Sequence, residues 1–309
     1  MSDAPPVAIR TEELAKRYGK ITALAGLTMS IPAGDVFGFL GPNGAGKTTA
    51  VKLLLGLARP SSGEGWVLGA PLSDRTAHRQ ARRGVGYLPE LFRYQHWLSA
   101  REVLRVHCEL IGLDRAQWDA EIKDALVLVG LADRADDRVG SYSKGMQQRL
   151  GLGVALLGRP ALVLLDEPTS ALDPVGRHDV REIIRTLKAR GTTVFLNSHL
   201  LTEVEQVCDR VAIVDHGRVI QVGTLGELLV TDAVRVRATG LENGALDGLR
   251  TFGELSQEGE WLVVRGIPAL RVPELVRAIV ERGGQVYAVE PRHESLEDRF
   301  LSLLEKPRT

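Results

Sequence analysis

The chain has 309 residues, 44% of them hydrophobic, and its 39 basic and 39 acidic residues give a formal net charge of zero. This balance excludes a broad basic surface for non-specific nucleic-acid binding, so we expect no nucleic-acid partner. The two cysteines, Cys108 and Cys208, lack the spacing of a metal or redox motif, which leaves a place in the core as the simplest reading.

The N-terminal residues and the longest apolar stretch indicate where in the cell the protein is expected. Residues 1–6 lack the basic and apolar regions of a secretion signal. The longest apolar stretch, Leu150 to Leu165, is too short to cross a bilayer and is interrupted by Arg159-Pro160. We therefore predict a cytoplasmic protein that reaches a membrane only through a partner.

The first two predicted strands precede a glycine-rich loop. Val7–Ile9 and Leu24–Ile31 have strand-like patterns, and Tyr18-Gly19-Lys20 indicates a turn between them. A tyrosine in a turn is more often a surface anchor than a ligand. A stacking role against adenine becomes competitive for Tyr18 if a nucleotide site lies nearby.

The loop that follows has the form of a phosphate-binding loop. The apolar strand Val36–Leu40 leads into Gly41-Pro42-Asn43-Gly44-Ala45-Gly46-Lys47-Thr48-Thr49, and a helical pattern continues from there. The glycines allow successive N–H groups to turn inward, so these donors, the helix N-terminus and the Lys47 ammonium converge on the β- and γ-phosphates. Thr48 offers its hydroxyl to Mg²⁺. The alternative is a plain turn between a core strand and a core helix, but every fixed position of the motif is filled. We predict a nucleoside triphosphate site.

The stretch from about residue 92 to 158 is predicted to be a helical insertion in an α/β domain. A strand that begins at Val85 and ends in a loop at Glu90 precedes it. Apolar residues recur at helical spacing from Ser99 to Gly130, and Ser99 with Glu102 has the spacing of a capping box. A Ser/Gly turn, Tyr142-Ser143-Lys144-Gly145-Met146, opens the last helix.

Two further apolar strands end in polar side chains. Ala161–Leu165 is a continuous apolar run, typical of a central parallel strand, and it ends in Asp166-Glu167-Pro168. The strand Thr192–Ser198 is followed by His199. A lone histidine there would usually be structural. Because α/β sheets place ligands at the carboxyl ends of their strands, the motif residues gathered at this edge favour a ligand role for it.

The composition changes between residues 223 and 232, which predicts a first domain of residues 1–225 and a second of residues 232–309. In the second, strands at 234–237, 261–264 and 285–289 alternate with helices at about 242–249, 272–282 and 296–304. This part contains no glycine loop, metal cluster or catalytic constellation. The predicted fold is an α/β P-loop NTPase core with an antiparallel β subdomain and a helical insertion. A small C-terminal α+β domain follows it, with a ferredoxin-like arrangement as one option.

The order of these motifs resembles one family. The phosphate loop, Ser143–Gln147, Asp166–Pro168, Ser170–Asp173 and His199 follow one another as in the ATP-binding subunits of ATP-binding-cassette (ABC) transporters. The resemblance covers about residues 7–223. The phosphate loop alone would leave many NTPase families open, whereas this combination is highly specific. The Gly-Tyr-Leu-Pro-Glu and Tyr-Ser-Lys-Gly-Met segments, with the tail residues 294–301, are similar to drug- and antibiotic-export (ABC-2 type) ATPases, whose permease is a separate chain.

The resemblance implies a role for each candidate residue. Tyr18 would stack on adenine, Asp166 would assist Mg²⁺ binding, Glu167 would polarise the attacking water and His199 would contact the γ-phosphate. Ser143 and Gly145 would close over the γ-phosphate bound by a partner subunit, and Asp173 would lie at the subunit contact. An independent argument agrees, because phosphoryl transfer needs charge neutralised on the γ-phosphate and a water held in line. Lys47, Mg²⁺ and His199 serve the first need, and Glu167 serves the second.

Three positions depart from the broader family. Lys144 and Met146 stand where glycine and glutamine are common, and Glu90 stands where glutamine is usual, in the loop that senses nucleotide. Two interpretations of Glu90 remain open. It reaches Mg²⁺, directly or through one water, or it points to solvent and pairs with a basic residue of the permease.

We predict a subunit that binds and hydrolyses ATP with Mg²⁺ and works as a homodimer or with a second ATP-binding subunit. It would dock on a separate transmembrane permease at the inner face of the cell membrane to export a substrate that the permease selects. The alternative is a soluble cassette ATPase that remodels a ribosome, DNA or an Fe–S assembly complex. Ribosomal members typically carry two cassettes and DNA-repair members long coiled coils, and this chain has neither pattern. A third interpretation makes the C-terminal domain a regulatory binding module with ATP as a switch.

Overall fold

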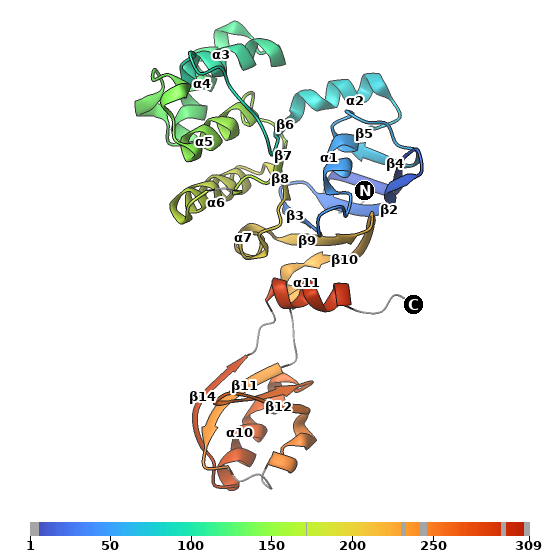
Figure 1. The fold of residues 1–309 in the computed structure, drawn as a ribbon, viewed down its shortest axis with the longest axis vertical. Helices are drawn as coiled ribbons and strands as arrows, with labels where there is room; N and C mark the ends of the chain where they lie inside the picture. The colour runs from blue at the N-terminus through green and yellow to red at the C-terminus, as the bar shows by residue number, and fades with distance from the viewer. Residues whose placement is uncertain (1–5, 171, 230–232, 242–245, 292–294, 306–309) are drawn as a thin grey trace. The chain divides into compact units, whose positions relative to one another are not determined.

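The computed structural model describes residues 6–170, 172–229, 233–241, 246–291 and 295–305. The chain divides into two compact units, Met1–Leu225 and Gly226–Thr309 (Figure 1). Cys108 and Cys208 are free and buried, as predicted. None of the helices in the described ranges combines the length and the apolar character that crossing a membrane requires.

A ten-stranded mixed sheet forms the framework of the first unit, in the order β5-β4-β1-β2-β10-β9-β3-β8-β7-β6. Strands β9, β3, β8, β7 and β6 run parallel to one another, whereas β2, β1, β4 and β5 pair antiparallel. This confirms the predicted α/β core with an antiparallel subdomain. The strands are β1 (Val7–Tyr18), β2 (Ile21–Pro32), β3 (Val36–Leu40), β4 (Ser62–Val67), β5 (Ala70–Pro71), β6 (Val85–Leu88), β7 (Leu162–Asp166), β8 (Thr193–Asn197), β9 (Arg210–Asp215) and β10 (Arg218–Thr224).

The first hairpin is longer than its apolar segments predict. Strands β1 and β2 have 12 residues each and are joined through Gly19-Lys20, where Gly19 has a φ of +58°. The predicted strand at residues 7–9 covers only the first part of β1, because the rest of β1 alternates buried and exposed residues. A strand with one solvated face carries this alternation rather than an apolar run.

Helices cover both sides of the parallel strands: Figure 1 shows α1 on one side and α6 and α7 on the other. Helices α3, α4 and α5 pack against one another between β6 and β7 in the chain and form the helical insertion. The capping box at Ser99 and Glu102 is present, and Gly112 ends that helix with a φ of +72°. The helices are α1 (Lys47–Leu54), α2 (Arg75–Ala81), α3 (Ala100–Ile111), α4 (Trp118–Leu128), α5 (Lys144–Ala155), α6 (Pro174–Ala189) and α7 (Leu201–Val207).

The core of the first unit lies where α1 covers the sheet. Strands β3, β7 and β8 are buried at every residue, as expected for parallel strands covered on both faces. The ring centroid of Phe195 lies 5.2 Å from that of Phe39 and 6.2 Å from that of Phe37. This packing fixes β3 beside β8, and both strands lead directly into the candidate site.

A four-stranded antiparallel sheet in the order β12-β13-β11-β14 forms the second unit. Helix α10 connects β13 to β14 and packs against β14, while β11 lies between these two strands. This split β-α-β connection is the one expected of a ferredoxin-like domain. The elements of this unit are β11 (Ala233–Thr239), β12 (Glu254–Glu258), β13 (Trp261–Arg265), β14 (Gln285–Pro291), α10 (Val272–Glu281) and α11 (Leu296–Glu305), with α8 (Leu225–Leu229) beginning at the boundary.

Two differences from the predicted elements lie in this unit. Strand β12 was not predicted, since its sequence is polar and it lies at the edge of the sheet. Of the predicted helix 242–249, residues 242–245 lie outside the described residues, and Leu246 and Asp247 are helical.

Candidate functional site

Four neighbouring parallel strands deliver the candidate residues to one edge of the sheet. In the order β3-β8-β7-β6, their carboxyl ends lead to the phosphate loop, to His199, to Asp166-Glu167 and to Glu90. Parallel strands all present their carboxyl ends at the same edge, where α/β sheets bind ligands. The topology therefore gathers residues that are up to 158 positions apart in the chain, from Gly41 to His199.

The glycines of the phosphate loop are required by its backbone and by its neighbours. Gly44 and Gly46 have φ angles of +85° and +99°, which side chains rarely adopt. A Cβ on Gly46 would lie 2.4 Å from the carbonyl oxygen of Ala23, and one on Gly41 would lie 2.3 Å from the carbonyl oxygen of Val214. The loop therefore packs so closely against β2 and β9 that no residue larger than glycine fits at positions 41 and 46.

The turn between β9 and β10 also supports the loop. The N–H of Gly217 donates to the carbonyl oxygen of Ala45 at 2.9 Å, and the carbonyl oxygen of Gly217 accepts from the N–H of Ala25 at 2.9 Å. The β9–β10 turn therefore links the phosphate loop to β2.

Lys47, the first residue of α1, bonds back to the loop that it follows. Its Nζ atom donates to the carbonyl oxygen of Gly41 at 2.7 Å and lies 3.4 Å from that of Pro42. Burial lowers the pKa of Lys47, while the negative charges of Glu167, Asp166 and Glu90 act in the opposite direction. The Lys47 ammonium is thus within electrostatic reach of these three carboxylates.

Thr48 and Thr49 follow Lys47 in the first turn of α1. Thr48 is exposed and Thr49 is half-buried. The Thr48 hydroxyl is therefore accessible at the N-terminus of the helix, where the macrodipole favours an anion.

Asp166 ends β7 and is held by Asn197, which ends β8. The Nδ2 amide of Asn197 donates to Oδ1 of Asp166, and these two residues are register partners in the sheet. Burial raises the pKa of Asp166, the hydrogen bond from Asn197 opposes this, and the charges of Glu90 and Glu167 add to it. A buried carboxylate beside two others is stabilised by a nearby cation.

Glu167 lies just past the end of β7 in an unusual backbone conformation. Its φ of +52° is in the left-handed region that non-glycine residues seldom adopt, and its N–H donates to the carbonyl oxygen of Asn197 at 2.8 Å. Its Oε2 atom lies 2.7 Å from Nδ1 of His199. Backbone strain of this kind persists where the surrounding structure fixes it, and it clusters at functional sites.

Glu90 and Tyr18 border this group in different ways. Glu90 is exposed, and its charge acts on both Lys47 and Asp166. Tyr18 ends β1 at 47% exposure, and the ammonium of Lys16 lies 4.8 Å from its ring centroid. Ala23, three residues after the Gly19-Lys20 turn, contacts Gly46. Strand β2, which follows Tyr18, therefore runs beside the phosphate loop.

The Ser143 segment forms the N-terminus of α5. Ser143 is exposed and caps the helix, with its Oγ accepting from the N–H of Met146 at 3.2 Å. In the described part of the chain, no hydrogen bond or ion pair joins Ser143 or Gly145 to Lys47, Glu167 or His199. The structure brings together Lys47, Glu90, Asp166, Glu167 and His199, and it does not bring Ser143 and Gly145 to them.

Asp173 caps α6, and its Oδ1 accepts from the N–H of Gly176 at 2.8 Å. Ser170 lies directly after the Glu167 turn, with its N–H donating to the carbonyl oxygen of Glu167 at 3.2 Å. Ala171, within the same motif, lies outside the described residues.

Two further residues support the site without having been predicted. Asn197 positions both Asp166 and Glu167, and a polar residue at the end of an apolar strand was the one signal for it. Gln148 on α5 donates from Nε2 to the carbonyl oxygen of Pro168 at 2.9 Å, so it ties the helix that Ser143 caps to the turn after Glu167. Nothing in its local sequence indicated this long-range bond.

Comparison with known proteins identifies the family. A family model described as ABC transporter matches residues 24–170. Over 98% of its length the chain is 37% identical to an uncharacterised ABC transporter ATP-binding protein of Nostoc sp., 92% of which is covered. It is also 37% identical, over 96% of each chain, to the Nod factor export ATP-binding protein I of Burkholderia orbicola.

Solved structures agree with this relationship. The ATP-binding subunit of an ABC transporter is 31% identical, with a TM-score of 0.64 over 72% of this chain and 91% of that chain. The protein cbiO1 of Clostridium perfringens, part of the ABC transporter complex cbiONQ, is 27% identical, with a TM-score of 0.66 over 72% and 90% of the two chains. The chain therefore belongs to the ATP-binding proteins of ABC transporters, and it binds and hydrolyses ATP.

Proposed function

We propose that this ATPase acts as a dimer, in which the Ser143 segment of each subunit closes over ATP bound to the phosphate loop of the other. The observation that carries this proposal is the surroundings of Gly145. A Cβ added there would meet nothing closer than 3.9 Å, and its backbone needs no positive φ. Glycine near the start of a helix costs up to about 1 kcal/mol relative to alanine, and no neighbour in its own subunit requires it. We therefore attribute the glycine at position 145 to the close approach of a group from outside the subunit.

Within each site we assign the chemistry to five side chains. Glu167 orients the attacking water and accepts its proton, while His199 contacts the γ-phosphate. Lys47 leaves the carbonyl oxygen of Gly41 to bind the phosphates, and Tyr18 stacks on adenine. Asp166 stays fixed by Asn197 throughout, because its role is to hold charge rather than to move a proton.

The oxygen donors at the site fit a magnesium ion. Asp166, Thr48 and Glu90 offer two carboxylates and a hydroxyl, the ligand type that Mg²⁺ prefers. Across the ranges that the structure describes, no group of three His, Cys, Asp or Glu side chains forms a metal site. Mg²⁺ is usually held by one or two carboxylates together with substrate phosphates and water, and Asp166 and Glu90 supply the two carboxylates. When bound, Mg²⁺ neutralises charge that develops on the phosphates.

We further propose that the dimer drives export through a separate permease chain. The support comes from relatives named as Nod factor export ATP-binding proteins, one of which aligns over 96% of both chains. The protein would work at the cytoplasmic face of the membrane, bound to the permease. The permease would select the cargo.

The two units also receive separate roles in this proposal. Residues 1–225 form the ATP-binding domain, with the helical insertion at about residues 92–158, and residues 232–309 form an accessory domain. A truncation before Asp232 is expected to leave ATP affinity unchanged, because every assigned residue precedes it. Loss of ATP affinity in a folded truncation would contradict this division.

The dimer is tested with Glu167→Gln, which should bind ATP and turn it over too slowly to separate. Light scattering with ATP should show a dimer for Glu167→Gln and a monomer for the double variant with Ser143→Arg, whose bulk blocks the closed contact. Ser73→Arg, which adds the same side chain at an exposed serine in the turn before α2, serves as the control. A monomer for Glu167→Gln, or a dimer that survives Ser143→Arg, would sink the proposal.

The transport assignment has its own test. A tagged chain solubilised with its membranes in mild detergent should co-purify with an integral membrane protein. Co-purification with ribosomal or DNA-associated proteins, and with no membrane protein, would instead support the soluble remodelling ATPase.

A further inference from the structure

Helix α2 and the 3₁₀ turn that follows it concentrate positive charge in a short segment. Four of the nine residues from Arg75 to Arg83 are arginines, and no acidic residue occurs from Arg75 to Pro89. The preceding Asp74 caps α2 by accepting from two backbone N–H groups. Because the chain as a whole has no net charge, this basic segment is a local feature of one surface.

Contacts with α1 fix which side of α2 faces inward. Nε2 of His78 lies 2.9 Å from the carbonyl oxygen of Leu54, and Nη1 of Arg82 donates to the carbonyl oxygen of Leu55 at 3.0 Å. A Cβ on Gly56 would lie 2.9 Å from the ring of His78, so α2 packs directly on the end of α1. The other arginines of the segment lie on the sides of α2 that this contact leaves free.

These three residues, Arg75, Arg79 and Arg83, form what we call the arginine stripe. All three are exposed, and in the part of the chain that the structure describes their side chains have no hydrogen bond, ion pair or ring contact. Arg75 and Arg79 have the i,i+4 spacing at which like charges destabilise a helix, and a cation at the first helical position is also unfavourable. The stripe therefore lowers the stability of its own helix, an effect that an anionic partner would offset.

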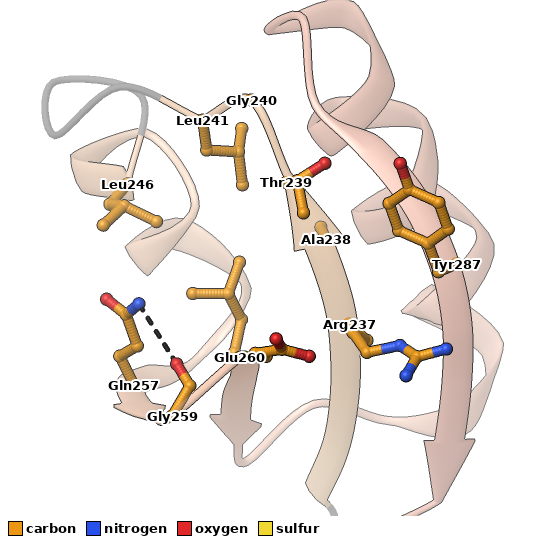
Figure 2. A pocket seen from close by; sticks show the side chains of 11 residues that line it. Arg237, Ala238, Thr239, Gly240, Leu241, Leu246, Gln257, Gly259, Glu260 and Tyr287 are labelled. Carbon is orange, nitrogen blue, oxygen red and sulfur yellow. Dashed lines mark hydrogen bonds between the residues drawn. The ribbon is translucent and has the colours of Figure 1, made fainter.

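Two exposed arginines of the second unit differ from the arginine stripe, because each has a neighbour that stabilises its charge. Arg235 is paired with Glu290, and the guanidinium carbon of Arg237 lies 5.8 Å from the ring centroid of Trp261. Figure 2 shows Arg237 at a cavity of about 510 Å³, directed toward β14 and away from Glu260. The charged side chains of this cavity do not converge on one point, so the arginine stripe is the stronger indication of a partner.

An exposed apolar side chain lies beside the arginine stripe. Leu57 is 65% exposed and directly follows Gly56, which packs against His78 of α2. Figure 1 shows α2 at the periphery of the first unit, with α1 and β5 below it in that view. Basic side chains next to a protruding apolar one are typical of surfaces that bind a membrane interface, where headgroups take the charges and the acyl boundary takes the apolar group.

We propose that the arginine stripe and Leu57 bind directly to a membrane surface that contains anionic phospholipids. The planar donor fork of each guanidinium suits phosphate oxygens, and Leu57 enters the apolar boundary below the headgroups. A nucleic acid or an acidic segment of a partner protein offers the charge, whereas a bilayer offers charge and an apolar layer together. This contact goes beyond the proposed function, in which the chain reaches the membrane through a permease alone.

The first test uses the whole purified chain, without nucleotide or permease, and co-sedimentation with lipid vesicles at up to millimolar lipid. The chain is expected to bind vesicles of phosphatidylcholine mixed with phosphatidylglycerol. Binding to phosphatidylcholine alone should be about 100-fold weaker, because each of three arginines near an anionic surface contributes about fivefold. Added salt should weaken binding to the anionic vesicles, since it screens these charges.

A triple variant assigns the effect to the arginine stripe. With Arg75→Gln, Arg79→Gln and Arg83→Gln together, binding to anionic vesicles should fall about 100-fold, to the level that the wild type shows with phosphatidylcholine. A control variant removes the same charge from three exposed arginines of other elements and should keep its binding to anionic vesicles. The control replaces by glutamine the residues Arg190, Arg218 and Arg277.

Leu57→Ala tests the apolar part of the contact. It should weaken binding to anionic vesicles several-fold at low and at high salt alike, because the lost contact is apolar rather than electrostatic. ATP hydrolysis in solution shows whether each variant is folded, and it should stay unchanged because none of the replaced residues belongs to the ATP site. The comparison of the two kinds of vesicle needs only the wild-type chain, so it does not depend on any variant.

Four results would overturn the proposal. The first three are no binding to anionic vesicles at millimolar lipid, equal binding to both kinds of vesicle, and equal losses in the triple variant and its control. The fourth is a triple variant that binds anionic vesicles as the wild type does but no longer co-purifies with an integral membrane protein, which would assign the arginines to the permease. The ATP-dependent dimer is measured without lipid, so failure of lipid binding would leave the proposed function untouched.

Discussion

The Nδ1 atom of His199 lies 2.7 Å from Oε2 of Glu167, which joins the residue after β8 to the residue after β7. Because a carboxylate only accepts hydrogen bonds, Nδ1 carries the proton of this pair. The N–H of His199 approaches the same oxygen at 3.4 Å. Glu167 is thus oriented through Oε2 alone, and within the described residues its Oε1 atom makes no hydrogen bond. We infer that Oε1 is the oxygen that faces the attacking water.

Glu167→Gln is expected to lower turnover by about 100-fold or more while ATP still binds. The amide keeps the shape of the side chain but is a far weaker base than the carboxylate. Steady-state phosphate release measures turnover, and equilibrium titration with a fluorescent ATP analogue measures binding. Glu182→Gln, at an exposed glutamate of α6 paired with Arg185, should behave as wild type. Near-normal turnover in Glu167→Gln would show that the base is another group.

We predict that Gly44→Ala and Gly46→Ala, both in the phosphate loop, differ in stability and in ATP binding. Gly44→Ala should lower the free energy of unfolding by about 1–2 kcal/mol, the cost of a left-handed conformation with a side chain, since nothing lies within 4 Å of the added atom. Gly46→Ala has the same backbone cost and in addition a contact of 2.4 Å with the carbonyl oxygen of Ala23.

Gly46→Ala should therefore be the less stable of the two and should lose ATP binding, because the loop must move away from β2. Urea unfolding without nucleotide measures the first effect and titration with the ATP analogue measures the second. Equal stability and equal affinity in the two variants would mean that β2 does not fix the loop.

Asp166→Asn is expected to stabilise the nucleotide-free protein at neutral pH. In the wild-type protein, burial is the main cause that raises the pKa of Asp166 in the folded state. The folded state therefore binds the proton of this carboxyl more tightly than the unfolded state does. Stability from this group is fully present below the ordinary value of 3.8 and is lost as pH rises through the folded pKa. Removing the ionisable group removes that loss.

The stabilising effect of Asp166→Asn should therefore be largest at neutral pH and should shrink as pH falls toward 3.8. Chemical unfolding at a series of pH values, without ATP and Mg²⁺, measures it. The same variant should bind Mg²⁺–ATP more weakly. Asp133→Asn, at an exposed aspartate of the helical insertion, is the control. A variant less stable than wild type at neutral pH would show that the Asn197 bond outweighs the burial of charge.

The parts of the site that the sequence predicted are those encoded by local spacing. The loop from Gly41 to Thr49 and the pair Asp166-Glu167 were found because each is a short motif at the end of an apolar strand. The sheet order was not predictable in this way. β8 lies between β3 and β7 although it follows both in the chain, and only long-range packing, such as that of Phe195 on Phe37 and Phe39, decides it.

The residues that were missed depend on the same long-range order. Asn197 is a supporting residue only because β7 is the neighbour of β8, which brings its amide to Asp166. Strand β12 was missed because Glu254–Glu258 has one apolar residue among polar ones, and an edge strand is specified by its partner β13 rather than by its own propensity.

Glu90 gives a prediction that separates its two interpretations. It is exposed, yet its charge raises the pKa of both Lys47 and Asp166, so it lies within electrostatic reach of the proposed Mg²⁺ site. If it contributes to Mg²⁺ binding, directly or through one water, Glu90→Gln removes a negative charge from the ion's surroundings. The Mg²⁺ concentration needed for half-maximal hydrolysis by the isolated subunit should then rise.

The measurement is ATP hydrolysis against Mg²⁺ concentration at fixed ATP, with no permease present. Glu64→Gln, at an exposed glutamate of β4 in the antiparallel subdomain, makes the same chemical change and should leave the curve in place. Pairing with a permease residue instead predicts an unchanged Mg²⁺ curve and weaker coupling of hydrolysis to transport. Superimposable curves for wild type and Glu90→Gln would eliminate the metal interpretation, because a carboxylate that reaches the ion cannot lose its charge without weakening the ion's binding.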